Sequence, residues 1–364
     1  ISGEEWLTAF AIVTSVAITM AMTLILMPLA HRVGLVDCPD ARKDHKGEIP
    51  LVGGIAMLFG FTFAVLMLPA ALVPQRAMFA AALLLVAVGI LDDFKELTAR
   101  ARFAAQIAAA LIMTAIGGVT LHQLGYLFQG NAIVGLDFLA VPVTVIAVVG
   151  GINALNMMDG LDGLAGGIAL IALGGLAWLA GAGGATSEAS ILMVAVGCVA
   201  GFWIFNLRRP GQPRARVFMG DAGSMFLALV FAWFAVQLSQ NPGAVMKPVT
   251  AIYLFAVPLM DTTYVMLRRL RRGKSPFRAD RTHLHHLLRA HGLAPGTTVS
   301  LMLAVSLVFA FVGVLGQQAL PAHYMFYAFV LAFLVYSIVC KVGWRAIPAE
   351  ARLAREQPAL REVA

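Results

Sequence analysis

Residues 153–167 read Asn153-Ala-Leu-Asn156-Met-Met-Asp159-Gly-Leu-Asp162-Gly-Leu-Ala-Gly-Gly, and the rest of the chain is arranged around them. Two asparagines and two aspartates recur at every third position, where one apolar segment ends and the next begins. On helical or nearly helical backbone this spacing keeps neighbouring members of the series close together. Amides and carboxylates at a membrane boundary favour a site for a hard cation and a polar substrate. The alternative is a helix cap followed by a glycine-rich packing face, but a cap needs only one aspartate.

The composition is that of a polytopic membrane protein. Of the 364 residues, 60% are hydrophobic and 12% are charged, whereas a soluble domain averages about 25% charged residues. With about 20 apolar residues to a span, we expect about eleven transmembrane helices and an all-α fold. They lie near residues 6–30, 51–69, 77–91, 103–117, 139–155, 164–180, 188–206, 223–239, 248–267, 298–316 and 324–341. We predict one integral-membrane domain over residues 1–344 and a short cytoplasmic tail over residues 345–364.

The basic residues predict the orientation of the chain. All but Arg76 and Lys247 fall in the tail or in connections on one side of the membrane. Because basic residues are retained in the cytoplasm, we expect the N-terminus outside, in the periplasm, and the C-terminus in the cytoplasm. Orientation alone explains much of this charge, and anionic lipid headgroups would be attracted to it. On the outer side, residues 118–140 contain a Gln-Gly-Asn turn and predict a small hairpin.

Five aspartates fall at the cytoplasmic ends of spans. They are Asp92, Asp93, Asp159, Asp162 and Asp221. A carboxylate there is costly unless it meets water, a cation or a partner, so we expect the five to converge on one site. The adjacent pair repel each other, which favours a general base or a neighbouring metal, with a solvated helix end as the alternative. The last of the five could be a simple helix cap, but flanking glycines also suit anion binding at a helix start.

Two cytoplasmic loops carry further candidates. Lys46 precedes a span and could direct its ammonium at a phosphate or serve only as a basic anchor. In the largest loop, Asp280 is predicted to cap an interfacial helix that contains His283-Leu-His285-His286. On that helix the first and last histidines should share a flank while the middle one points elsewhere. Zinc sites on helices prefer pairs spaced by four residues, so a flank that binds phosphate is favoured over zinc.

The ninth span holds two unusual residues. Pro258 should kink it. Asp261 is the one carboxylate expected inside a span, and we expect it to pair with an arginine rather than to act.

Assembled, these elements resemble the polyprenyl-phosphate N-acetylhexosamine-1-phosphate transferases nearly end to end. The resemblance rests on five motifs. They are Gly53-Gly54, Asp92-Asp93, the Asn153 to Asp162 series, Phe218-Met219-Gly220-Asp221 and His283-Leu-His285-His286. The form of the histidine motif is similar to that of the bacterial UDP-GlcNAc branch, whereas the muramoyl-pentapeptide branch usually carries three consecutive histidines.

The resemblance implies an enzyme of the bacterial inner membrane with its active site on the cytoplasmic face. It would transfer GlcNAc-1-phosphate from UDP-GlcNAc to undecaprenyl phosphate and release UMP. The lipid-linked product would start O-antigen, enterobacterial common antigen or a related glycan. Direct attack by the lipid phosphate is favoured over an aspartyl-phosphate intermediate.

The resemblance also implies roles for individual residues. Mg²⁺, or Mn²⁺, would be held by Asp221 and Asn156, with Asp159 supporting the metal. Asp92, helped by Asp93, would deprotonate or orient the lipid phosphate. The uridine pocket would be lined by Asp162, Asn206 and Phe218. Phosphates would be contacted by Lys46, Arg268, Arg269, His283, His285 and His286. The position of Asn206 relative to Asp221 departs from the muramoyl branch.

Two alternatives remain open. The same chemistry could use another UDP-N-acetylhexosamine or UDP-MurNAc-pentapeptide as donor. A lipid or nucleotide-sugar transporter is the alternative from another class, but transporters carry ionisable groups near the middle of the membrane. Here the acids gather at one face. No nucleic acid is expected as a partner, and whether the protein forms a homodimer is left open.

Overall fold

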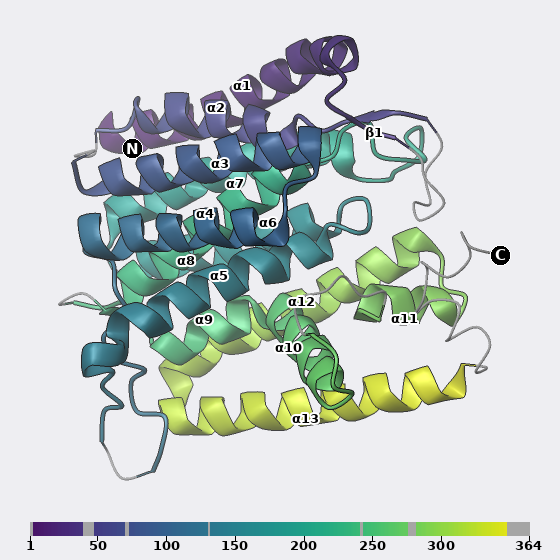
Figure 1. Cartoon of the computed structure of the whole chain (residues 1–364). Coiled ribbons are helices and arrows are strands. Elements are labelled where there is room, and N and C mark those ends of the chain that lie inside the picture. The colour runs from purple at the N-terminus through teal and green to yellow at the C-terminus, as the bar shows by residue number, and fades with distance from the viewer. Residues whose placement is uncertain are drawn as a thin grey trace.

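The computed structural model describes residues 3–38, 47–69, 73–129, 132–240, 243–275 and 282–347. The regular secondary structure of these residues is helical apart from one pair of two-residue strands (Figure 1). The long helices are α1 (Gly3–Val33), α2 (Gly53–Val65), α3 (Arg76–Lys95), α4 (Ala99–Leu111), α5 (Ala140–Met158), α6 (Leu164–Ala182), α7 (Thr186–Asn206), α8 (Gly220–Gln240), α10 (Ala256–Leu270), α12 (Pro295–Ala319) and α13 (Ala322–Ala346). The short elements are β1 (Val36–Asp37), β2 (Ile49–Pro50), η1 (Val73–Gln75), η2 (Ile112–Ile116), η3 (Asp137–Leu139), α9 (Pro248–Leu254) and α11 (Leu284–Ala290).

The helices confirm an all-α polytopic membrane protein. Nine of those described are long and apolar enough to cross a membrane, and α9 with α10 adds a tenth span bent by 83°. The remaining expected span is α2, which is apolar but has only 13 residues. All eleven expected segments are therefore helical. The orientation of the two termini stays a prediction, and most of the predicted tail lies outside the described residues.

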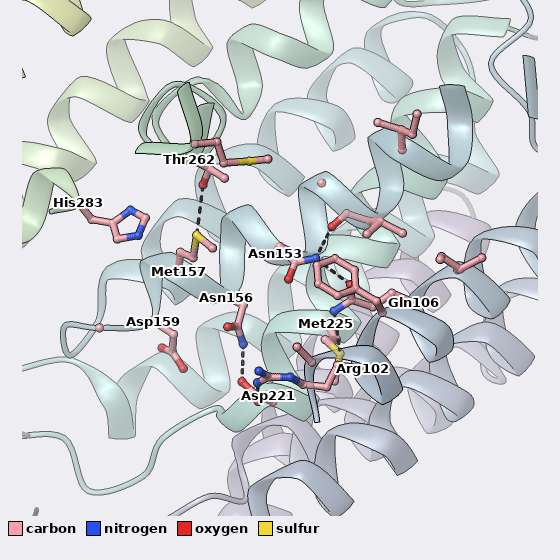
Figure 2. Close-up of a pocket in the computed structure, with 18 of the residues that line it drawn as sticks. Arg102, Gln106, Asn153, Asn156, Met157, Asp159, Asp221, Met225, Thr262 and His283 are labelled. Atoms are coloured by element: carbon pink, nitrogen blue, oxygen red, sulfur yellow. Dashed lines mark hydrogen bonds and ion pairs between the residues drawn. The ribbon is translucent and has the colours of Figure 1, made fainter. Parts of the chain in front are cut away.

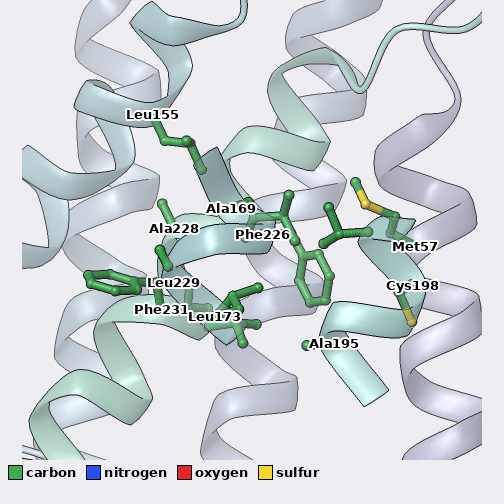
Figure 3. Packing of buried hydrophobic residues seen from close by; sticks show 14 of the residues in the cluster. Met57, Leu155, Ala169, Leu173, Ala195, Cys198, Phe226, Ala228, Leu229 and Phe231 are labelled. Carbon is green, nitrogen blue, oxygen red and sulfur yellow. The ribbon is translucent and has the colours of Figure 1, made fainter. Parts of the chain in front are cut away.

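Helix α8 forms the centre of the bundle. It is apolar around its whole circumference, which is typical of a helix buried on all sides, and it contains the fully buried Trp233, Phe226 and Phe234. Figure 3 shows side chains of α8 packed against those of α2, α5, α6 and α7. This packing fixes the N-terminal end of α8, where Asp221 lies.

The bend between α9 and α10 has a local cause. Proline lacks an N–H, and its ring conflicts with the carbonyl four residues earlier. For Pro258 that residue is Leu254, the last residue of α9. The predicted kink is thus confirmed, and α10 leaves the direction of α9 to pack against α5, α12 and α13 (Figure 1).

The segment between η2 and η3 forms the expected hairpin. Gln123 and Gly135 make an antiparallel bridge. The hydrogen bonds from Leu124 N to Val134 O (2.8 Å) and from Leu136 N to His122 O (2.8 Å) extend it. Residues 130–131 at its tip lie outside the described residues.

Candidate functional site

One cavity of about 710 Å³ lies where α4, α5, α8, α10 and α11 meet (Figure 2). Its polar lining residues include Arg102, Gln106, Asn153, Asn156, Asp159, Asp221, His283, His285 and His286. Its apolar lining residues include Phe103, Ile107, Val145, Ile146, Val149 and Met266. The cavity therefore offers charge and hydrogen bonds beside a hydrocarbon-like surface.

The end of α5 directs three members of the spaced series into this cavity. Asn153 Nδ2 donates to Gln106 Oε1 (2.7 Å), and Asn156 Nδ2 donates to the Asp221 carboxylate and to Ser224 Oγ (3.0 Å). Asp159 caps the C-terminus of α5 and lines the cavity. Helical spacing thus brings these side chains together, as the sequence predicts.

Asp162 departs from the series because the chain turns after α5 ends. Gly163 has φ of +86°, in the region that favours glycine. The Asp162 carboxylate faces the connection between α7 and α8, where its Oδ2 accepts from Arg208 Nε (2.7 Å) and Ala215 N (2.9 Å). It does not line the cavity.

The two adjacent aspartates at the end of α3 lie next to Asp221 but behind the cavity wall. Asp93 Oδ1 accepts from the backbone N–H of Asp221 (3.0 Å) and so caps α8 from a neighbouring helix. Its Oδ2 is buried with no hydrogen-bond partner. The carboxylate packs against Gly220, whose φ is +67° and where a Cβ would collide with it. Asp92 is buried and accepts from Leu97 N (2.6 Å).

Arg102 is a cavity residue that the sequence reasoning used only for orientation. Its guanidinium lies 3.1 Å from Asp92 Oδ2 and 3.5 Å from Asp221 Oδ2, while 40% of its side chain is exposed. Arg102 can therefore offset the charges of Asp92 and Asp221 and still contact an anion in the cavity. The sequence shows only that Arg102 is a basic residue one turn after the Thr98 cap of α4. Nothing in the sequence indicates that it contacts Asp221.

All three histidines border the cavity, which corrects the expectation that His285 points elsewhere. His283 is not part of α11 but its extended N-cap, so helical spacing does not relate it to the others. His285 is buried with its Nε2 against Gly160, and burial together with the neighbouring His286 lowers its pKa to about 3. The cap predicted at Asp280 lies outside the described residues.

Asp261 is completely buried, as expected, but its partners differ from the prediction. His283 Nδ1 lies 2.7 Å from its Oδ2, and the hydroxyl of Tyr336 donates to its Oδ1 (2.7 Å). An imidazole and a phenol therefore take the place of the expected arginine.

The other predicted substrate residues that the structure describes do not line the cavity. Asn206 is 1% exposed and bonds Gly163 N (2.8 Å) and Val217 O (2.9 Å), which holds two loops together. Arg269 Nε donates to Ser275 O (2.6 Å), and the Arg268 guanidinium lies over the Trp344 ring. Phe218 pairs through its backbone with Pro50 and Gly53. Lys46 lies outside the described residues. Their roles toward a substrate stay predictions.

The acidic end of the cavity suits a hard cation. Burial and the nearby charges of Asp221, Asp93 and Asp162 raise the pKa of Asp159 well above its usual value. Among the described residues, no three His, Cys, Asp or Glu side chains form a ready metal site. Mg²⁺, however, usually takes only one or two protein carboxylates and completes its coordination with water and substrate phosphates. The oxygen-rich set around Asp221 and Asn156 fits that ion.

Comparisons with known proteins show which proteins the chain is similar to. The profile of glycosyl transferase family 4 matches residues 76–239. A protein of Yersinia pestis is 37% identical over 329 residues, which cover 90% of both chains. A protein of Haemophilus influenzae is 36% identical over 344 residues, covering 94% of this chain and 96% of its own. One of Escherichia coli K12 is 35% identical over 322 residues, covering 87% and 86%. All three are named undecaprenyl-phosphate alpha-N-acetylglucosaminyl 1-phosphate transferase.

Proposed function

The chain belongs to glycosyl transferase family 4 and is a multi-pass membrane enzyme that transfers a sugar phosphate, and from this premise we propose its reaction. It transfers GlcNAc-1-phosphate from UDP-GlcNAc to undecaprenyl phosphate and releases UMP. Support comes from relatives of that name that align over about nine-tenths of both chains. We place the enzyme in the bacterial inner membrane, with its cavity on the cytoplasmic face, and its product at the start of O-antigen, enterobacterial common antigen or a related glycan.

The observation that carries the proposal is that one cavity is lined by charged and polar side chains as well as by apolar ones. A nucleotide sugar needs polar partners for its diphosphate. A polyprenyl phosphate needs an apolar path for its tail beside the same polar partners. Side chains such as Ile107 and Ile146 supply that path, while Asp159 and Arg102 face the charged groups.

Charge neutralisation is the main requirement of a reaction between two anionic phosphates. In our proposal Asp221 and Asn156 hold Mg²⁺ (or Mn²⁺), with Asp159 beside them, and the ion would offset the charge of the donor diphosphate. Arg102 directs a second positive charge into the cavity. Its orientation is set by Asp92, which holds the guanidinium at 3.1 Å.

The transfer then needs alignment rather than a covalent enzyme intermediate. A phosphate oxygen of undecaprenyl phosphate attacks the β-phosphorus of UDP-GlcNAc and forms the new oxygen–phosphorus bond. The bond from that phosphorus to the oxygen shared with the α-phosphate breaks, and UMP leaves with this oxygen. Asp92 accepts a hydrogen bond from Leu97 N, and Asp93 accepts one from Asp221 N. Carboxylates engaged in this way suit positioning more than nucleophilic attack.

The test is UMP release by purified protein supplied with undecaprenyl phosphate, Mg²⁺ and one of several UDP-sugars. We expect UDP-GlcNAc to be used at least about 100-fold better than UDP-MurNAc-pentapeptide, because polar sites that lose a partner discriminate strongly. A preference for another UDP-N-acetylhexosamine would change the substrate but keep the reaction. Uptake of UDP-GlcNAc into vesicles without any UMP release would instead identify a transporter.

A further inference from the structure

Asp261 joins three separate elements through one buried carboxylate. It lies on α10 with no exposed surface. Its Oδ2 faces His283 Nδ1 at 2.7 Å, and its Oδ1 accepts from the backbone N–H of Leu284 (2.8 Å) and from the hydroxyl of Tyr336 (2.7 Å). The carboxylate thereby connects the bent helix to the start of α11 and to α13.

A buried charge is costly unless hydrogen bonds and an opposite charge compensate for it. Asp261 receives three close donors, and only one of them, the His283 imidazole, also borders the cavity. An apolar residue of similar size could pack on α10 without this cost. The arrangement is therefore better explained by what the carboxylate does to the imidazole than by packing.

A carboxylate that accepts from one ring nitrogen determines the state of the other. Because a carboxylate only accepts, Nδ1 of His283 must carry the proton in the 2.7 Å contact. This fixes the plane of the ring and leaves Nε2 as the atom available to a ligand. The same logic operates where an aspartate orients the histidine of a catalytic triad.

Helix α13 holds the segment around His283 from two further points. Trp344 Nε1 donates to Thr282 O (3.2 Å), immediately before His283, and the His291 ring lies 3.1 Å from Gly343 O at the end of α11. Tyr336 itself packs edge to face on Tyr264 of α10. The phenol therefore has little freedom to leave the carboxylate.

We propose that Asp261 is a positioning residue which, together with Tyr336, keeps the His283 imidazole protonated at Nδ1 and presents the unprotonated Nε2 as an acceptor to a hydrogen-bond donor of the substrate, such as a sugar hydroxyl. The identity of that substrate rests on the proposed function. The geometry of the ring does not, because all three hydrogen bonds are made by the protein alone.

The kinetic test compares Asp261→Asn and Tyr336→Phe with Tyr327→Phe. The control removes the same atom from a tyrosine that lies on the exposed face of α13. We expect Asp261→Asn to lower kcat about 100-fold, the upper range for loss of a group that orients a functional histidine. Tyr336→Phe should lower it several-fold, KM for UDP-GlcNAc should change little, and the control should match the wild type.

A double variant separates positioning from simple structural support. If Asp261 acts through His283, adding Asp261→Asn to His283→Ala should cause no further loss of kcat. Independent losses that multiply in the double variant would overturn the proposal. Loss of stability is monitored by thermal unfolding, and Tyr336→Phe, which removes one hydroxyl, keeps the test valid if Asp261→Asn does not fold.

A second arm needs no substrate. In protein labelled with ¹⁵N-histidine, the ring signals of His283 are identified by their absence from His283→Gln. We expect Nδ1 to carry a proton in the wild type and to lose that preference in Asp261→Asn. An unprotonated Nδ1 in the wild type overturns the proposal. A wild-type protein that shows the expected ring state but releases no UMP would instead reject the proposed function.

Discussion

The carboxylate of Asp221 accepts a hydrogen bond from Asn156 Nδ2, and this contact joins the end of α5 to the first turn of α8. Asp221→Asn keeps the shape of the side chain but removes the charge that we propose binds Mg²⁺. We expect UMP release to fall by at least about 100-fold, as when a preorganised electrostatic group is removed. UMP release is measured across a Mg²⁺ titration, and a chelator should abolish the wild-type reaction.

Asp137→Asn is the matched control for this change. Asp137 is an exposed residue near the hairpin, and its φ of +43° is one that asparagine also tolerates. The control should keep full activity. Near-wild-type turnover by Asp221→Asn, or a wild-type reaction that proceeds without divalent ions, would remove the metal assignment.

Gly160 leaves room for the His285 ring. A Cβ on residue 160 would lie 2.9 Å from His285 Nε2, closer than such atoms approach, so the imidazole must shift. Gly160→Ala should lower kcat/KM for UDP-GlcNAc roughly 10-fold, since misplacing a cavity side chain by about 1 Å is costly. Gly151→Ala is the control, because nothing lies within 4 Å of its Cβ position. Equal activity of the two variants would show that the position of His285 does not matter.

Local patterns predicted much of this protein. Apolar runs of membrane length predicted the transmembrane helices. The three-residue spacing on α5 predicted that Asn153, Asn156 and Asp159 lie close together. Both signals depend only on residues that are near neighbours in the sequence. Pro258 gave the bend for the same reason. Each of these inferences needed no knowledge of which helices are adjacent.

The failures depend on where α11 begins and on contacts between segments far apart in the chain. His285 was placed on the wrong side because His283 precedes α11 rather than belonging to it. Asp261 has a histidine partner 22 residues away, and Arg102 reaches Asp221 only because α3, α4 and α8 pack together. Charge and spacing in a single sequence do not determine such pairings.

Gly54 on α2 makes a backbone-to-backbone contact with α8. A Cβ at this position would collide with the backbone of Ala222 and Gly223, which cannot rotate away as a side chain could. Gly54→Ala should therefore destabilise the protein by about 1–3 kcal/mol, the usual cost of overpacking. Thermal unfolding in detergent measures this. Gly174→Ala, which meets nothing within 4 Å, should unfold at or above the wild-type temperature; a matching loss there would point to a general effect of alanine.

Buried His285 should make the protein sensitive to acid. Its pKa is lowered to about 3 in the folded protein, while an unfolded histidine titrates near 6.5. As the pH falls from about 6.5 toward 3, the unfolded state binds a proton that the folded state refuses, and stability falls by up to about 1.4 kcal/mol per pH unit. His285→Gln should lose this part of the pH dependence, whereas the exposed His122→Gln should retain it. The measurement is the unfolding midpoint of the wild type and both variants at pH 7 and pH 5. If the midpoint changes equally with pH in all three proteins, the burial argument is wrong.

Arg102 offers the sharpest test of how the lipid phosphate is bound. Its guanidinium already faces Asp92 and Asp221, yet part of the side chain remains exposed in the cavity. An incoming phosphate could therefore accept a hydrogen bond from it. A hydrogen bond between charged groups contributes about 1.5–3 kcal/mol, so Arg102→Gln should lower kcat/KM for undecaprenyl phosphate about 10- to 100-fold. The exposed Arg100→Gln removes the same charge two residues away and should have little effect. If both variants lose activity equally, the general positive charge of this face attracts the lipid. If only Arg102→Gln is impaired, and the loss depends on undecaprenyl phosphate rather than UDP-GlcNAc, the side chain itself binds the acceptor.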